Sequence, residues 1–74
     1  MKDCVLRINK YINGSFEYSV YDPQTNINLA KGIRKRAIEA YNDALQFLYA
    51  NEHDINISKF ILPNQLKTRL GLDS

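Results

Sequence analysis

Residues 4–21, CVLRINKYINGSFEYSVY, decide the fold. Asn13-Gly14 lies between two runs of alternating apolar and polar residues, and Asn-Gly tolerates the positive φ angles of tight hairpin turns. A three-residue loop over 13–15 pairs Ile12 with Phe16, and it gathers the apolar side chains on one face, whereas a two-residue loop scatters them. The sequence therefore predicts a β-hairpin whose buried face consists of Leu6, Ile8, Ile12, Phe16, Tyr18 and Val20.

The opposite face of this hairpin is polar and carries exposed tyrosines, as in an antiparallel sheet with one solvated face. Arginine and tyrosine on such a face can contact nucleic acid or a protein partner, or they can simply stabilise cross-strand pairs. A glutamate in the middle of the face, Glu17, counts against a path for phosphates. The face consists of Arg7, Asn9, Tyr11, Glu17, Ser19 and Tyr21.

A third strand and a long helix follow the hairpin. Asp22-Pro23-Gln24-Thr25 has the chemistry of a type I turn. Residues 26–31 read as a strand in which Ile27 and Leu29 point inward, and Gly32 ends it. From residue 33 or 34 to residue 51 the apolar period becomes helical. The apolar stripe of this helix consists of Ala37, Ile38, Tyr41, Ala44, Leu45 and Leu48.

The last third of the chain adds one strand and one short helix. Residues 55–62, INISKFIL, read as a fourth strand, and Pro63 begins a short helix that Gly71 stops. The order β-β-β-α-β-α predicts a single two-layer α+β domain over residues 1–74. In it, one main helix covers one face of a three- or four-stranded, mainly antiparallel sheet.

Composition narrows the function classes. The single cysteine, Cys4, cannot form an internal disulfide and continues an apolar face, so we expect it to be buried. No segment is apolar enough for a membrane span or a signal peptide, so we expect a cytoplasmic protein. There is one histidine, His53, and no phosphate loop, serine elbow or Cys/His pair, so we expect neither catalysis nor a cofactor or metal.

The charge is unevenly distributed along the chain. Residues 1–36 carry seven Lys or Arg against three acids, whereas residues 37–74 carry three against five. Arg34, Lys35 and Arg36 are expected in the first helical turn, where cations oppose the helix dipole. A bound phosphate would reverse that penalty, because it would meet three cations and free backbone N–H groups. The alternative is a solvated basic turn, partly offset by Glu39.

Residues 12–48 resemble the arm-type DNA-binding domain of tyrosine integrases and its plant ethylene-response relatives. The matching helix segment is KRAIEAYNDAL, residues 35–45, although the usual lead into that helix is replaced by LAKGIRKRA. In that family a three-stranded sheet lies in the major groove, so the resemblance implies Arg7, Tyr11 and Tyr21 as reading residues. The fourth strand and second helix are additional to that family.

Two further resemblances point to different partners. The basic helix entrance is similar to the second helix of double-stranded-RNA-binding domains, where basic residues contact phosphates. The order β-β-β-α-β resembles the partial ribonuclease-H-like fold of HicB-type antitoxins, which act by binding a protein. The HicB-type fold, unlike the arm-type domain, includes a fourth strand after the helix.

The sequence predicts a non-catalytic module that docks on duplex nucleic acid. Lys31, Arg34, Lys35 and Arg36 would contact phosphates, and Arg7, Tyr11 and Tyr21 would present the sheet face. The alternative is a small phage-encoded or antitoxin-type inhibitor or adaptor that blocks a host protein. Its interface would be the tyrosine face or the free edge of the fourth strand. A homodimer is compatible with both functions, nucleic-acid docking and protein inhibition.

Overall fold

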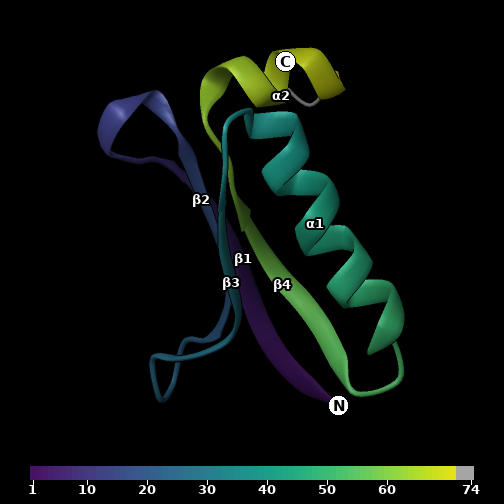
Figure 1. Cartoon of the computed structure of the whole chain (residues 1–74). Helices are drawn as coiled ribbons and strands as arrows, with labels where there is room; N and C mark the ends of the chain where they lie inside the picture. The colour runs from purple at the N-terminus through teal and green to yellow at the C-terminus, as the bar shows by residue number, and fades with distance from the viewer. Residues whose placement is uncertain (72–74) are drawn as a thin grey trace.

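In the computed structural model, which describes residues 1–71, four strands form one sheet and a long helix packs on one of its faces (Figure 1). The α+β class and the order β-β-β-α-β-α are confirmed. Among residues 1–71, no helix is long and apolar enough to cross a membrane. The strands and α-helices are β1 (Lys2–Lys10), β2 (Phe16–Asp22), β3 (Ile27–Arg34), α1 (Ala37–Ala50), β4 (Ile55–Ile61) and α2 (Asn64–Leu70), and a short 3-10 turn (Ile12–Gly14) lies between β1 and β2.

The first hairpin has the predicted faces but a different register. Lys10 pairs with Phe16 and Ile8 with Tyr18, so the predicted pairing of Ile12 with Phe16 is wrong by two residues. Because side chains alternate along a strand, a shift of two residues keeps each one on its face. The predicted buried face is therefore retained without Ile12, which is 71% exposed.

The loop of this hairpin is wider than the predicted three residues. The Tyr11 N–H donates to the Ser15 carbonyl over 2.6 Å and closes the loop. Asn13 and Gly14 both take left-handed φ angles, 67° and 76°. The Asn-Gly pair therefore makes the turn as predicted, but within a five-residue connection.

β3 is longer than predicted because Gly32 lies inside it. The strand was expected to end at this glycine, but it continues to Arg34, which pairs with Phe16. Tyr18 lies opposite Gly32, and a Cβ atom at Gly32 would be 2.5 Å from Tyr18 Cε2. Glycine leaves room here for an aromatic ring that lies close to the backbone, and the strand does not stop at it.

α1 packs on the sheet through small side chains. Ala37, Ala40 and Ala44 are buried, which lets the helix lie close to the strands. The predicted helix start at residue 33 or 34 was wrong, because the backbone as far as Arg34 pairs in β3. Leu45, predicted to face the core, is only half-buried at the side of the helix.

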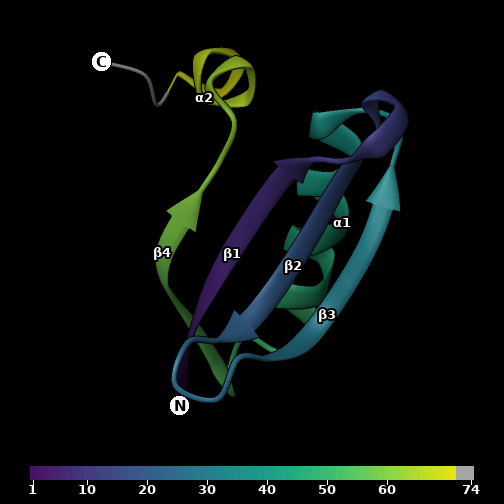
Figure 2. The ribbon, with the colours of Figure 1, turned by 90° about the vertical axis from the view of Figure 1, so that its left-hand side faces the viewer.

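β4 makes the sheet mixed. It pairs parallel with β1 in the order β3-β2-β1-β4, so β3 and β4 are the edge strands. Ser58 is an extra residue in this pairing, and its hydroxyl donates to the Cys4 carbonyl over 3.2 Å. In Figure 2, α1 lies behind the other three strands while β4 runs along the side away from it. Since β4 and β1 run in the same direction, α2 begins at the end of the sheet where β1 ends.

The core lies between the sheet and α1, with Leu66 added from α2. Cys4 is fully buried, as predicted. Ile27 was predicted to point inward, but it is 60% exposed at the start of β3. It lies near the point where the register of the β2–β3 pairing shifts, between Val20 and Tyr21. The buried apolar residues are Cys4, Val5, Leu6, Ile8, Phe16, Val20, Ala37, Ala40, Ala44, Leu62 and Leu66.

Candidate nucleic-acid interface

Cationic side chains gather at one end of the molecule, where β1, β3 and β4 finish and α1 begins. Lys10 and Arg34 occupy one row of the sheet, on either side of Phe16. Two strand spacings separate their Cα atoms by roughly 10 Å. Lys35 and Arg36 form the connection from β3 to α1. We call this surface the basic end; it consists of Lys10, Arg34, Lys35, Arg36, Lys67 and Arg69.

Lys67 and Arg69 lie at the basic end because their helix, α2, packs against the start of α1. Ala37 and Ile38 of α1 line a cavity of about 250 Å³ together with Gln65, Leu66 and Arg69 of α2. Leu66 is 1% exposed, so it fixes α2 in place. Lys67 lies with Arg69 in the last turn of α2. The C-terminal third of the chain thus adds two cations to those of the β3–α1 connection.

Among residues 1–71, one cation of the basic end is paired with an acid. Arg34 Nη1 donates to Asp43 Oδ2 over 2.6 Å, and this hydrogen bond raises the pKa of Arg34. Within residues 1–71, no ion pair joins an acid to any of the other five. Lys35 and Arg36 are exposed, and Glu39 is the acid in the first turn of α1. The basic end therefore keeps a positive excess.

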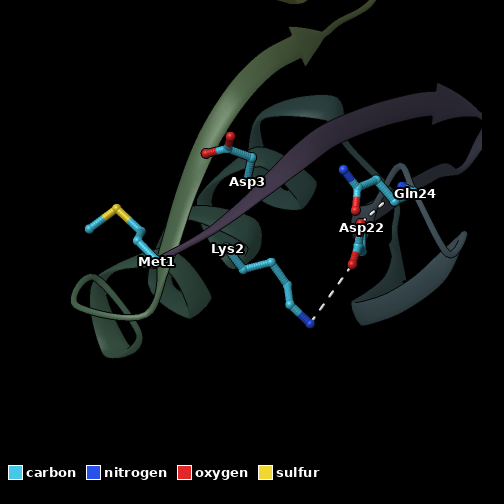
Figure 3. A pocket seen from close by; sticks show the side chains of 5 residues that line it. All are labelled: Met1, Lys2, Asp3, Asp22 and Gln24. Atoms are coloured by element: carbon cyan, nitrogen blue, oxygen red, sulfur yellow. Dashed lines mark hydrogen bonds and ion pairs between the residues drawn. The ribbon is translucent and has the colours of Figure 1, made fainter.

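The opposite end of the molecule is acidic. The Lys2 N–H donates to the Asp54 carbonyl over 2.8 Å, which brings the loop after α1 beside the start of β1. Lys2 and Asp22 line a cavity of about 520 Å³ (Figure 3), and Lys2 Nζ lies 3.8 Å from Asp22 Oδ2. The acids at this end are Asp3, Asp22, Glu52 and Asp54.

α1 runs from the basic end to the acidic end (Figure 1). A helix carries partial positive charge at its N-terminus and partial negative charge at its C-terminus. The helix dipole therefore has the same direction as the separation of charged side chains. Both effects make the potential more positive at the basic end.

The open face of the sheet holds three of the predicted site residues, and each has a partner within the fold. The Arg7 guanidinium lies over the Tyr21 ring, 5.1 Å from its centre, and Arg7 Nε is buried with no hydrogen-bond partner among residues 1–71. Lys31 Nζ lies 3.7 Å from Glu17 Oε2. Arg7, Ser19 and Lys31 form one row across β1, β2 and β3. Both cations of this face, Arg7 and Lys31, therefore already contact another side chain of the fold.

The seven predicted site residues therefore divide between two places. Arg7, Tyr21 and Lys31 lie on the open face. Tyr11, 43% exposed, follows Lys10 in the hairpin loop and lies at the basic end with the run of Arg34, Lys35 and Arg36. That run was expected in the first helical turn, which was wrong: Arg34 is still in β3, and Arg36 precedes the helix in extended conformation.

Sequence reasoning missed three cations of the basic end: Lys10, Lys67 and Arg69. Lys10 could have been found, because a three-stranded meander places the end of its first strand beside the end of its third. Lys67 and Arg69 depend on β4 being parallel to β1, and residue periodicity does not reveal strand direction.

His53 remains exposed in the loop after α1, with Nε2 3.7 Å from Glu52 Oε1. Within the described residues, no group of three or more His, Cys, Asp or Glu side chains could hold a metal ion. No protein-family model matches this chain, and neither the curated proteins nor the solved structures contain a significant match to it.

Proposed function

We propose that this chain is a cytoplasmic, non-catalytic module that binds duplex nucleic acid through the basic end. The observation that carries the proposal is the meeting of Lys10, Lys35, Arg36, Lys67 and Arg69 at one end of the sheet, with no acid paired to them among residues 1–71. These cations come from β1, from the β3–α1 connection and from α2.

A duplex is the polyanion that suits such an end. It carries about one negative charge per 1.7 Å of its axis, and each phosphate that a cation neutralises releases counterions. The acidic end, with Glu52 and Asp54, would be repelled by the same phosphates. The module would therefore approach with the basic end first, and the Tyr11 ring beside Lys10 would lie at the contact.

The proposed surface differs from the sheet face that the arm-type resemblance implied. Arg7 is stacked on Tyr21, and Lys31 is paired with Glu17, so docking through that face would have to break both contacts. Lys35 and Arg36 need no such rearrangement. We therefore assign phosphate contacts to the basic end and a structural role to the Arg7–Tyr21 stack.

The test is fluorescence anisotropy with labelled duplex DNA and labelled duplex RNA at about 50 mM and 200 mM salt. A Lys35→Gln/Arg36→Gln variant should lose most of the binding. The matched control is Lys2→Gln/Lys31→Gln, which removes the same charge from two cations that are paired with acids elsewhere. Binding that survives in the first variant, or is lost equally in the control, would refute the basic end as the contact surface.

A second candidate function is capture of a host protein by an antitoxin-type or phage-encoded inhibitor or adaptor. It is favoured by the free edge of β4, since strand edges accept partner strands. The fourth strand is also a feature that the HicB-type comparison accommodates and the arm-type comparison does not. Capture through this edge should be abolished by Phe60→Ser, and capture through the tyrosine face by Tyr11→Ser/Tyr21→Ser. Lys35→Gln/Arg36→Gln should leave either kind of capture intact, and the reverse pattern would exclude this function.

A further inference from the structure

We propose that two copies of this chain pair through the edges of β4, antiparallel, with the two-fold axis between Ser58 and Lys59. The interface lies along β4 and the adjoining side of α1. Its test uses no nucleic acid, so it stands or falls separately from the nucleic-acid proposal, although the pairing brings Glu52 and Asp54 of one copy beside Lys67 and Arg69 of the other.

The backbone edge of β4 is available for pairing. β4 is hydrogen-bonded to β1 on one side, and on its other side no strand of residues 1–71 lies next to it. It is seven residues long and contains no proline. Such an edge presents unpaired N–H and C=O groups that a second strand can satisfy.

An apolar strip on α1 adjoins this edge. Ile38, Tyr41, Leu45 and Tyr49 recur at steps of three and four, so they share one side of the helix. Asp43 projects from the other side and reaches Arg34 of β3. The strip therefore faces away from β3 and toward β4.

Exposed aromatic rings mark this strip and the neighbouring strand. Tyr49 is 69% exposed on α1 and Phe60 is 45% exposed on β4. Phe60 pairs with Leu6, whose side chain lies in the core, so both are on the helix-covered side of the sheet. In Figure 2, α1 lies behind the other strands and not behind β4, so the helix does not cover the side of β4 to which Phe60 belongs. A second copy at this edge would cover both rings.

The irregularity at Ser58 selects the register of the pair. Before it, Ile57 is opposite Cys4 and shares the helix-covered side, while Asn56 is opposite Asp3 on the open side. After it, Phe60 is on the helix-covered side and Ile61, opposite Arg7, is on the open side. Directly opposed residues of antiparallel strands share a face.

With a two-fold axis between Ser58 and Lys59, residues that lie opposite each other in the two β4 strands share a face. This axis places Phe60 opposite the second copy's Ile57, and Ile61 opposite its Asn56. An axis on Ser58 itself would place Asn56 opposite Phe60, which lie on different faces. The favoured register also places Lys59 opposite Ser58 rather than opposite a second lysine.

Charge complementarity supports a second copy as the occupant. Antiparallel pairing brings the start of one β4 beside the end of the other. Glu52 and Asp54, which precede β4, then lie next to the α2 helix of the second copy, which carries Lys67 and Arg69. The acidic end of each copy is placed beside the basic end of the other.

The first test is the mass of the full chain in solution, measured by sedimentation equilibrium over a range of concentrations. The wild-type chain should reach twice its 8.6 kDa at high concentration. Phe60→Ser should shift the mass toward the monomer, and circular dichroism should show that it is folded. Ile33→Ser is the matched control, because it removes a comparably exposed apolar side chain, 49% exposed, from the other edge strand.

A second test does not rely on a weakened variant. Asn56→Cys and Ile61→Cys are prepared separately, mixed and oxidised mildly. The proposed register brings these two positions opposite each other, within the Cα separation that a disulfide spans, about 4.4–6.8 Å. A covalent dimer should form in the mixture and not in either variant alone.

A wild-type chain that stays monomeric throughout overturns the proposal, as does a dimer that Ile33→Ser dissociates and Phe60→Ser does not. A cross-link in either single variant, or none in the mixture, overturns the register.

Discussion

Arg34 at the end of β3 and Asp43 in the middle of α1 form a hydrogen-bonded ion pair, with Nη1 and Oδ2 2.6 Å apart. The pair ties the last residue of β3 to the helix that follows it. Solvent screens an exposed pair of this kind, so its main effect is on charge rather than on stability. It removes one cation from the phosphate-binding capacity of the basic end.

Releasing that cation should strengthen nucleic-acid binding. Asp43→Asn leaves Arg34 without its acid partner, and one additional phosphate contact should steepen the log–log salt dependence by about 0.9. The measurement is duplex binding at several salt concentrations. Glu52→Gln is the control, because it changes the net charge equally at the acidic end. An equal gain in both variants would show that only net charge matters, against a localised contact.

The approach of the Tyr18 ring to Gly32 should make this glycine hard to replace. Gly32→Ala introduces a Cβ atom 2.5 Å from Tyr18 Cε2, so the ring must move within a packed surface. Overpacking of this kind costs about 1–3 kcal/mol of unfolding free energy, which urea denaturation measures. In a Tyr18→Ala background the same substitution should cost much less. Equal costs in the two backgrounds would mean that the ring is not the cause.

The buried thiol of Cys4 should make stability fall at alkaline pH. Burial, together with the nearby Asp22 carboxylate, raises the pKa of Cys4 above its ordinary value. In the unfolded chain this thiol loses its proton near pH 8.5, roughly, whereas the folded chain retains it to higher pH. The folded state then binds more protons, so the unfolding free energy decreases as pH rises through that window.

Cys4→Ala isolates this contribution. We expect the unfolding free energy of the wild-type chain to fall more steeply than that of Cys4→Ala between about pH 8 and pH 10. Parallel declines would assign the effect to other titrating groups. Alkylation gives an independent check, because the fully buried thiol should react with iodoacetamide only after the chain is unfolded.

The sequence predicts the faces of the first hairpin better than its register. The alternation of apolar residues from Leu6 to Val20 fixes which residues face the core, and a register that differs by an even number of residues keeps the same faces. The observed register differs from the predicted one by two residues, so only Ile12 lies in a different environment from the one predicted. Gly32 was misread for a different reason. Its neighbour Tyr18 is fourteen positions away in the chain, and no local pattern shows that a ring lies across from it.

The candidate site was only partly predictable for a similar reason. The run of Arg34, Lys35 and Arg36 is visible as consecutive cations, whereas Lys67 and Arg69 join it through the parallel β1–β4 pairing. Alternation along residues 55–61 is the same for a parallel and an antiparallel strand, so the sequence does not distinguish them. The partner of Arg7 also depends on side-chain placement across two strands.

The salt dependence of duplex binding tests the central claim most directly. The wild-type chain, titrated at salt concentrations from about 50 to 200 mM, should give a log–log slope of about −4 to −5, since five cations of the basic end have no acid partner among residues 1–71 and can each neutralise one phosphate. Lys35→Gln/Arg36→Gln should reduce the magnitude of that slope by about two, and Lys2→Gln/Lys31→Gln should leave it unchanged. An absence of binding at the lowest salt, or a slope that the first variant does not change, would contradict the assignment of the basic end as a nucleic-acid interface.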